Sequence, residues 1–330
     1  MRLGIDAGGT FTDLVADDGR TVKVPSTPAE PAQALRDALA AAGTAVPDLL
    51  AHGTTVATNA LLQRRLGRVA LVTTRGFADV IEIARQVRPS LYDVTRDRPE
   101  PLVPRDLRLE VGGRLDGAGK ELEALDGVTV PEVPAGVDAV AVCLLHADLD
   151  ARHEERVADE LAARGLDVSC SHEVSPEFRE YERLVTTVAN AGLRRVCRAY
   201  LLELAGLARE VLVMTSAGGL VPVADAADTP AALLLSGPAG GVRAAAAVAA
   251  ACGYPDAVSF DMGGTSTDVC LVRGGVPEPA PARVVAGYPV RLPALDIHTI
   301  GAGGGSIARL DAGGALVVGP ESAGAVPGPA

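Results

Sequence analysis

The sequence predicts an α/β fold made of two similar lobes. Short apolar runs alternate with stretches of helical period along the 330 residues, an order typical of α/β proteins. The pattern D-x-G-G-T-x-T-D occurs twice, in GIDAGGTFTDLV at residues 4–15 and in SFDMGGTSTDVC at residues 259–270. Because both copies read as strand–turn–strand, we expect each lobe to open with the same β-turn-β unit.

Composition and charge exclude several classes of protein. A formal net charge of −12 argues against a nucleic-acid or anionic-membrane partner. The five cysteines are dispersed without a C-x-x-C pair, which indicates a reduced protein without a disulfide framework or structural zinc site. The sequence shows neither a signal peptide nor an apolar run of transmembrane length. We therefore expect a soluble, cytoplasmic protein.

The sequence of the first half of the chain indicates three strands and a helix, followed by two units of strand, turn and helix. Residues 2–24 read as three antiparallel strands, and a helix follows over roughly 29–42. Residues 48–67 and 68–86 each read as strand, turn and helix. Residues 99–136 are rich in Pro and Gly with short alternating patches, which predicts hairpins of a smaller subdomain or an inserted flap.

The middle of the chain continues the α/β alternation. The unbroken apolar run at 137–148 predicts a buried parallel strand, and a charged helix follows at about 150–164. Residues 177–207 predict a long helix with a break near Gly192. Residues 210–219 then read as a strand that ends in a glycine turn.

The last part of the chain carries the second copy of the repeated pattern. Residues 232–253 read as strand, turn and helix, and residues 256–275 as strand, turn and strand. We expect one lobe at residues 1–175 with the first copy and a second lobe at residues 176–330 with the second copy.

The repeated G-G-T turn has the chemistry of a phosphate-binding loop. Glycine lacks a Cβ and lets backbone N–H groups approach a ligand, and threonine hydroxyls add further donors. The aspartate before each turn lies at a strand end, where a carboxylate can hold Mg²⁺ or its waters. One copy alone is as well explained by an ordinary hairpin. Two copies that share every specified position favour a clamp in which each lobe grips the polyphosphate of a nucleotide.

This layout resembles the actin-like ATPase superfamily, and longer segments resemble the hydantoinase A/5-oxoprolinase family in particular. The resemblance covers essentially the whole chain. The segments that carry it are HGTTVATNALLQRR (52–65), ALVTTRGFADVIEIARQVRPSLYD (70–93), PEFREYERLVTTVANA (176–191), LLSGPAGGV (234–242), FDMGGTSTDV (260–269), LDIHTIGAGGGSIA (295–308) and VGPESAGAVPGPA (318–330).

The resemblance implies ATP-dependent hydrolysis of a cyclic amide such as 5-oxoproline, a hydantoin or a related lactam. An unstrained amide is a poor electrophile, so phosphorylation of its carbonyl oxygen would activate it for attack by water. Some relatives instead carboxylate ketones with ATP, which gives an alternative function. A small-molecule kinase fits the same ATPase class, although the segments at 52–93 and 295–308 count against it. A non-catalytic nucleotide-binding partner subunit is a further alternative.

The resemblance also implies ATP and Mg²⁺ as cofactors. It implies roles in binding them for residues of both D-x-G-G-T-x-T-D turns. Asp6 and Asp261 would hold Mg²⁺ through water, and Thr10 and Thr265 would contact phosphate. Asp13 and Asp268 would orient the threonines, or are simply solvated strand ends. The cofactor-binding residues that the resemblance implies are Gly8, Gly9, Thr12, Asp13, Gly263, Gly264, Thr267 and Asp268, with Gly303 and Gly304 of the GAGGGS segment.

Substrate contacts are implied more weakly. The side chains concerned are His52, Thr54, Thr55, Asn59, Arg85 and Arg88. The first four lie at a helix start, where free N–H groups favour an anion. Alternatively, Thr55 caps the helix and Asn59 makes a local hydrogen bond. Glu82 and Arg85 are spaced as a surface ion pair. The other histidines show no metal-ligand spacing, so no histidine-based metal site is expected.

The chain departs from the family in length. Family members are roughly twice as long, and the later F-G-G-A-G-P turn that would hold adenosine has no counterpart here. We therefore expect an incomplete second lobe with exposed apolar surface, whether the chain is a fragment, a split subunit or an inactive short form. A second chain that supplies the missing C-terminal region, or a hydantoinase B-type subunit, is the expected macromolecular partner.

Overall fold

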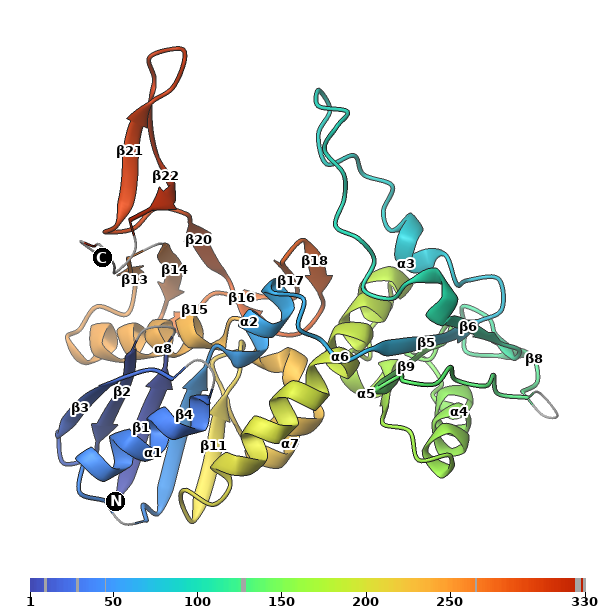
Figure 1. The fold of residues 1–330 in the computed structure, drawn as a ribbon, viewed down its shortest axis with the longest axis horizontal. Coiled ribbons are helices and arrows are strands. Elements are labelled where there is room, and N and C mark those ends of the chain that lie inside the picture. Colours follow the sequence, from blue (N-terminus) through green and yellow to red (C-terminus); the bar gives the residue numbers. More distant parts are fainter. Residues whose placement is uncertain are drawn as a thin grey trace. The chain divides into compact units, whose positions relative to one another are not determined.

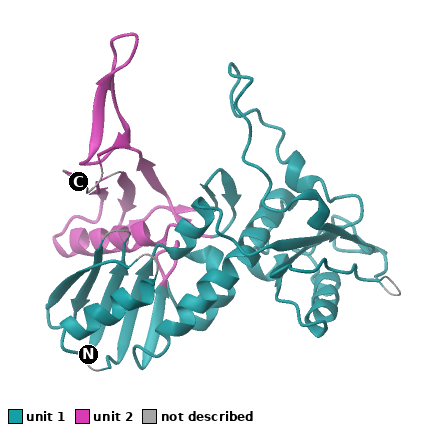
Figure 2. Ribbon diagram, viewed as in Figure 1, with its two compact units in different colours: residues 1–213, 220–234, 281–292 teal, residues 214–219, 235–280, 293–330 magenta. Residues whose placement is uncertain are grey.

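The fold is known from a computed structural model, which describes residues 1–8, 11–27, 30–44, 46–125, 129–264, 266–323 and 328. Two compact units make up the chain (Figure 2). Unit 1 comprises residues 1–213, 220–234 and 281–292, and unit 2 comprises residues 214–219, 235–280 and 293–330. The lobe boundary at residue 175 stays a prediction.

Unit 1 contains a six-stranded sheet in the order β12–β11–β4–β1–β2–β3 (Figure 1). Strands β1, β2 and β3 are antiparallel, which confirms the prediction for residues 2–24, whereas β4 runs parallel to β1 and to β11. Alternate side chains of β2 are buried, as expected for a strand with one face in the core. The strands are β1 (Arg2–Ala7), β2 (Phe11–Ala16), β3 (Thr21–Pro25), β4 (Leu49–Thr54), β11 (Glu210–Met214) and β12 (Leu220–Pro222).

Helix α1 (Pro31–Ala41) packs on β1, β2 and β3. Proline occupies its first turn, where the missing N–H has no intrahelical partner, and Gly43 follows its end with a φ of +64°. Its buried side chains recur at helical spacing: Ala32, Ala34, Leu35, Ala38 and Leu39. Helix α2 (Val56–Leu62) follows β4, as the sequence predicts.

A second sheet of unit 1 has the order β10–β9–β5–β6, and all its pairings are parallel. Every residue of β5 and β9 is buried, which confirms the parallel strand predicted at 137–148 and agrees with the run of apolar residues in each. Its elements are β5 (Val69–Thr74), α3 (Val80–Ile83), the 3₁₀ turn η1 (Arg105–Leu107), β6 (Arg108–Val111), β9 (Ala139–Cys143), α4 (Arg152–Ala163), β10 (Val168–Cys170) and α5 (Ser171–Val174).

Residues 99–136 differ in part from their prediction as hairpins. Strands β7 (Arg114–Leu115) and β8 (Glu121–Glu123) do form one. The segment before them instead supplies β6, which extends the parallel sheet beside β5. Its alternating pattern resembles that of a hairpin strand, and only tertiary pairing distinguishes the two.

Helix α6 (Glu180–Leu204) runs unbroken through Gly192, so the predicted break is wrong. The glycine serves packing instead: a Cβ built there would lie 3.2 Å from Leu66 Cβ and 3.4 Å from Val69 Cγ2. The helix is buried from 183 to 193 and packs against strands of the second sheet and against α1 and α2. It therefore packs both on the second sheet and on the helices that flank the six-stranded sheet.

The predicted strand near residue 232 is also wrong. Helix α7 (Val223–Asp228) leads into a 3₁₀ turn, η2 (Pro230–Leu233), and α8 (Ser236–Ala251) begins three residues later. Pro230 opens the 3₁₀ turn and removes the backbone donor that a strand would need there. Unit 1 is completed by the hairpin of β17 (Arg283–Val285) and β18 (Tyr288–Val290).

Unit 2 is built around the second copy of the repeated pattern. Strand β14 pairs antiparallel with β13, β15 and β20, and helix α8 packs on this sheet (Figure 1). The predicted strand–turn–strand at 256–275 is confirmed. The strands are β13 (Ala257–Met262), β14 (Thr267–Arg273), β15 (Val276–Pro277), β16 (Pro279–Ala280), β19 (Ala294–Leu295), β20 (Ile297–Ile300), β21 (Ser306–Leu310) and β22 (Leu316–Ser322).

No helix in the described part of the chain is long and apolar enough to cross a bilayer. All five cysteines are free thiols, and only Cys252 is exposed.

Candidate functional site

The first copy of the repeated pattern joins β1 to β2 in unit 1. In this register Asp6 lies opposite Asp13 on β2 and beside Gly53 on β4. The N–H of Gly8 donates to the carbonyl of Phe11 at 3.0 Å, which starts the turn. Gly9 and Thr10 lie outside the described residues, so their predicted roles stay predictions.

The Asp6 carboxylate lies directly against the backbone of β4. A Cβ built on Gly53 would be 2.7 Å from Asp6 Oδ1, closer than real Cβ contacts allow. Glycine at position 53 therefore leaves the space that the carboxylate occupies. Asp13, the other acidic residue of the pattern, forms an exposed ion pair in which Lys23 Nζ lies 3.1 Å from its Oδ1. This agrees with the alternative that Asp13 is a solvated residue at a strand end.

Hydroxyl groups bind the turn to the segment after β3. Thr12 is buried, and its Oγ1 lies 3.0 Å from Ser26 Oγ. Ser26 in turn donates to the carbonyl oxygen of Gly8 at 2.8 Å. Ser26 is not among the site residues predicted from the sequence, although its position between two prolines in P-S-T-P marks a turn before a helix.

A cavity of about 640 Å³ opens beside this turn. Asn59 of α2 and the residues at the two ends of this helix, Thr55 and Gln63, supply polar groups at the four-residue spacing of a helix. Arg65 is the one cationic residue of the described lining, and that lining holds no carboxylate. The lining residues are Ala7, Gly8, Thr12, Ser26, Thr27, Pro31, Ala34, Thr55, Val56, Asn59, Ala60, Gln63, Arg65, Val196 and Tyr200. Ligand sites commonly combine apolar walls with a few polar groups in this way.

The residues predicted at the start of α2 also bind one another. Thr54 Oγ1 accepts the N–H of Val56 at 3.2 Å. Thr55 donates to the carbonyl of Ala7 at 3.4 Å and accepts from Asn59 Nδ2 at 3.2 Å. Asn59 thus makes the local hydrogen bond that was predicted as the alternative to substrate binding. Thr55 and Asn59 still line the cavity, and their contact with substrate stays a prediction.

His52 lies in the interior, where both ring nitrogens have protein partners. The carbonyl oxygen of Ile5 can only accept, so Nδ1 donates to it at 3.1 Å, and Nε2 accepts from the Tyr200 hydroxyl at 2.6 Å. Burial lowers the pKa of His52 to about 4, so the ring is neutral at pH 7. Neither nitrogen is available to a substrate in this arrangement, and the predicted substrate contact stays a prediction.

Arg85 makes an ion pair different from the one its spacing suggests. Its guanidinium forms a two-pronged contact with Glu182 of α6, with Nε 2.8 Å from Oε1, and this contact raises the pKa of Arg85. Glu82 pairs with Arg108 at 2.7 Å, so the expected pair of Glu82 with Arg85 is wrong. Arg88 is exposed. A role of either predicted arginine in substrate binding stays a prediction.

The second copy of the pattern lies in unit 2 and is covered by the GAGGGS segment. The N–H groups of Gly304 and Gly305 donate to the carbonyls of Gly263 and Gly264 at 2.9 and 2.8 Å. A Cβ on Gly303 would lie 2.5 Å from the oxygen of Gly263, so only glycine fits. The structure thus brings these predicted residues together, with the N–H of Gly304 used to hold the turn.

The side chains around the second turn have mixed roles. Thr267 Oγ1 donates to the carbonyl of Ala302 at 2.6 Å, and Asp268 Oδ1 accepts from Thr299 at 2.5 Å. Asp261 is exposed at the end of β13, and its Oδ2 lies 3.7 Å from a Cβ built on Gly241 of α8. Thr265 lies outside the described residues.

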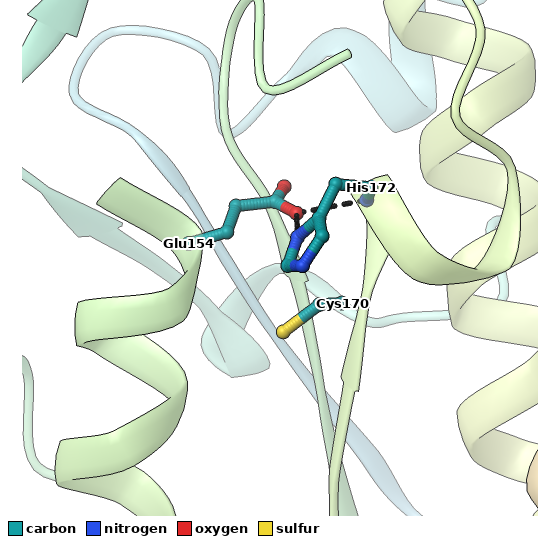
Figure 3. A group of neighbouring side chains, drawn as sticks. All are labelled: Glu154, Cys170 and His172. Carbon is teal, nitrogen blue, oxygen red and sulfur yellow. Dashed lines mark hydrogen bonds and ion pairs between the residues drawn. The ribbon is translucent and has the colours of Figure 1, made fainter. Parts of the chain in front are cut away.

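Glu154, Cys170 and His172 place potential metal ligands within 4.8 Å of one another (Figure 3). The Glu154 carboxylate is fully buried and accepts four hydrogen bonds. Its donors are the Leu144 N–H, the Ser171 hydroxyl, the His172 N–H and His172 Nδ1. Burial also raises the pKa of the Cys170 thiol, which disfavours the thiolate that a metal needs. The group therefore fits a buried ion pair better than a metal site.

Two family models cover nearly all of the chain. The model described as hydantoinase/oxoprolinase N-terminal region matches residues 2–165, and the model described as hydantoinase/oxoprolinase matches residues 183–330. The chain belongs to the hydantoinase/oxoprolinase family, as its sequence motifs predict.

Individual relatives include enzymes of several kinds. The caprolactamase subunit alpha of Pseudomonas jessenii is 38% identical over 99% of this chain and 51% of its own length. The 5-oxoprolinase 1 of Arabidopsis thaliana is 33% identical over all of this chain and 30% of its own length. This chain thus spans about half of the first relative and less than a third of the second.

Two solved structures of related enzymes align with almost the whole of this chain. The crystal structure of the ATP-dependent caprolactamase from Pseudomonas jessenii aligns with a TM-score of 0.87 at 36% identity, over 100% of this chain and 52% of that one. A nucleotide-free acetone carboxylase, from a study of ATP-dependent acetone carboxylation, aligns with a TM-score of 0.75 at 28% identity, over 98% of this chain and 51% of that one. The α/β fold is therefore shared with both.

The buried His52 should make the free energy of unfolding depend on pH. Its folded pKa of about 4 lies below the ordinary 6.5, so the unfolded state takes up a proton first as the pH falls. Stability should therefore decrease between pH 6.5 and 4, by roughly 3 kcal/mol from this residue. Urea unfolding at several pH values, with His52→Asn as comparison, measures this. An equal slope in both proteins would contradict it.

Glu154→Ala should lower the free energy of unfolding by about 3–5 kcal/mol, because it leaves its four donors buried without an acceptor. Glu155→Ala, at the exposed neighbouring position, should change it by less than about 0.5 kcal/mol. Denaturant unfolding measures both.

The ion pair adds a pH dependence of its own. The hydrogen bond that His172 donates to Glu154 raises the pKa of His172, so this stabilisation is complete below pH 6.5 and is lost as the pH rises through the raised value. If Glu154→Ala and Glu155→Ala lowered the free energy of unfolding equally, the structural role of Glu154 would be contradicted.

Proposed function

We propose that this chain is the nucleotide-binding and amide-activating part of an ATP-dependent hydrolase of cyclic amides such as 5-oxoproline, a hydantoin or a related lactam. The proposal rests on the cavity of unit 1 beside the first glycine turn, whose apolar walls carry a few polar groups, with Asp6 at the adjoining strand end. Similarity to the ATP-dependent caprolactamase and to 5-oxoprolinase 1 supports the same reaction class.

The proposed reaction has two parts. The carbonyl oxygen of the cyclic amide attacks the γ-phosphorus of ATP, which forms an O–P bond, breaks the bond to the bridging oxygen and releases ADP. Water then adds to the activated carbon and the C–N bond breaks with a proton passing to nitrogen, which leaves an acyl phosphate. A second water hydrolyses this acyl phosphate to the carboxylate and inorganic phosphate. The N–H groups of Gly9 and Thr10, whose roles stay predictions, would bind the oxygens that carry charge during the transfer, because the Gly8 N–H is held by the Phe11 carbonyl.

Mg²⁺ fits the residues at the strand ends. Asp6 would bind an ion in unit 1 through water, and Asp261 offers the same chemistry within unit 2, because hard cations prefer carboxylate and water oxygens. Bound there, Mg²⁺ would neutralise part of the phosphate charge. The lining of the cavity, with hydroxyl and amide groups on apolar walls, offers donors and acceptors to the ring amide of a substrate.

An actin-like ATPase fold is part of the proposal. In unit 1 the strand order β3–β2–β1–β4–β11, antiparallel across β1 to β3 and parallel beyond, supports it. A further subunit belongs to it too, since one relative is named as a subunit alpha.

A second candidate is an ATP-dependent ketone carboxylase subunit, which the similarity to acetone carboxylase favours. Such an enzyme would use a ketone as substrate and bicarbonate in place of water. Release of ADP in the presence of the ketone would then require bicarbonate. A non-catalytic nucleotide-binding subunit would bind Mg·ATP without either reaction.

Gly53→Ala should weaken Mg·ATP binding at least about tenfold, a loss of roughly 1.4 kcal/mol, because the new methyl group would push the Asp6 carboxylate off the strand. Isothermal titration calorimetry measures the affinity. Gly4→Ala is the matched control on β1, since a Cβ built there meets no atom within 4 Å. An unchanged affinity in Gly53→Ala, with its fold intact by circular dichroism, would contradict the assigned site.

A further inference from the structure

Unit 1 contains a second cavity, which the proposed reaction does not use. It has a volume of about 400 Å³ and is lined by residues of α3, the segment at 97–102, the N-terminal part of α6 and the β17–β18 hairpin. None of these lining residues also lines the cavity beside the first glycine turn. The two cavities are therefore distinct sites within one unit.

The β17–β18 hairpin forms a fixed wall of this second cavity. Gly287, in its turn, has a φ of +82°, and a Cβ built there would lie 2.5 Å from Pro99 Cγ. The buried Tyr288 donates its hydroxyl to the carbonyl oxygen of Glu100 at 2.5 Å. Arg64 lies over the Tyr288 ring, with its guanidinium carbon 5.3 Å from the ring centroid. The lining segment before β6 is thus held against the hairpin.

Aromatic and aliphatic side chains make up the apolar part of the lining. Tyr181 and Val185 lie four residues apart on α6 and therefore share one face of that helix. Tyr288 and Ile81 add two buried side chains from β18 and α3. A wall of this kind packs well against the methylene groups of a ligand.

Charged groups of both signs also line the cavity. Arg98 donates from Nη1 to the carbonyl oxygen of Ile83 at 2.9 Å, which holds the guanidinium in place, and no described residue accepts from its other nitrogens. The carboxylates of Asp97 and Glu100 likewise have no hydrogen bond or ion pair within the described part of the chain. One cation and two anions are therefore available to a ligand.

These charges lie close to the two tyrosine rings. Burial raises the pKa of Tyr181, and the charge of Arg98 opposes that rise. Burial also raises the pKa of Tyr288, and the Glu100 carboxylate adds to that rise. The remaining acidic group of the lining, Glu82, is already paired with a buried arginine at 2.7 Å. Arg98 and Glu100 are thus the charged groups that face the aromatic wall unpaired.

We propose that this second cavity binds the zwitterion of a free amino acid whose two charges are separated by a chain of methylene groups. Arg98 binds the carboxylate, Glu100 and Asp97 bind the ammonium group, and the tyrosine rings pack on the chain between them. A ligand with a single charge leaves the opposite group of the cavity without a partner. Hydrolysis of a lactam releases an amino acid of this kind. That link to the reaction rests on the proposed function, whereas the binding site does not.

The probe for the test is 6-aminohexanoate, which carries both charges on an unbranched chain. NMR spectra of the 330-residue chain, labelled with ¹³C in its five tyrosines, report on separate places in the fold. We expect the signals of Tyr181 and Tyr288 to shift, with Tyr92 and Tyr254, which are 96% and 69% exposed, unchanged. A shift of Tyr200 alone would place the ligand in the cavity beside the first glycine turn and overturn the proposal.

Matched ligands test the pairing of charges. Hexanoate lacks the ammonium group, hexylamine lacks the carboxylate, and ε-caprolactam lacks both charges. Each should bind at least about threefold more weakly than 6-aminohexanoate, the loss expected for a partly exposed ion pair. Equal affinity for hexanoate, hexylamine or ε-caprolactam would overturn the proposal.

Matched variants locate the contacts. Arg98→Gln and Glu100→Gln should each weaken binding of 6-aminohexanoate at least about threefold. Arg96→Gln and Asp106→Asn, at exposed positions outside the lining of the cavity, should leave it unchanged. No shift of Tyr181 and Tyr288, or equal losses in all four variants, would overturn the proposal.

None of these measurements uses ATP. Addition of Mg·ATP to the same labelled chain reports instead on Tyr200, which lines the cavity beside the first glycine turn. Failure of the amino-acid site and failure of the proposed nucleotide site are therefore observed separately.

Discussion

The burial of α6 on all sides is the constraint on which unit 1 depends. Between residues 183 and 193 the helix has no exposed face, and it packs against strands of the four-stranded sheet and against α1 and α2 beside the six-stranded one. Arg183 is fully buried there and would be costly without partners. Its guanidinium contacts the Asp148 carboxylate and donates to the carbonyls of Leu144 and Glu177, at 2.8 and 3.2 Å.

The same helix reaches the candidate site. Tyr200 lies near its end and holds His52 of β4 in one orientation, which fixes the strand beside Asp6. The cavity opens between α2, the first glycine turn and the residues after β3, and Tyr200 contributes to its lining. Rigid placement by buried elements is what a site for phosphoryl transfer requires, because the geometry of the reacting groups decides the rate. The proposed function rests on this placement.

Much of the fold could be predicted from the sequence because it depends on local signals. The hairpin of β1 and β2, the helix after two prolines and the buried run of β9 each carry their own pattern. The predicted break at Gly192 is wrong because this glycine packs against Leu66 and Val69 within an unbroken helix. The predicted strand near residue 232 is wrong because a 3₁₀ turn begins at Pro230. The pairs of Arg85 with Glu182 and of Glu154 with His172 join distant residues, so no spacing reveals them. Ser26 reaches the site through tertiary contacts with Thr12 and Gly8, which its place in the sequence does not show.

We propose that the first glycine turn of unit 1 binds the phosphates of ATP beside Asp6. A crystal structure of the 330-residue chain with Mg²⁺ and a non-hydrolysable ATP analogue is the most direct test. We expect phosphate oxygens within hydrogen-bonding distance of the backbone N–H groups of this turn, with the metal and its waters at the Asp6 carboxylate. An analogue bound elsewhere, with the turn and the cavity beside it empty, would show that this turn is not the phosphate site.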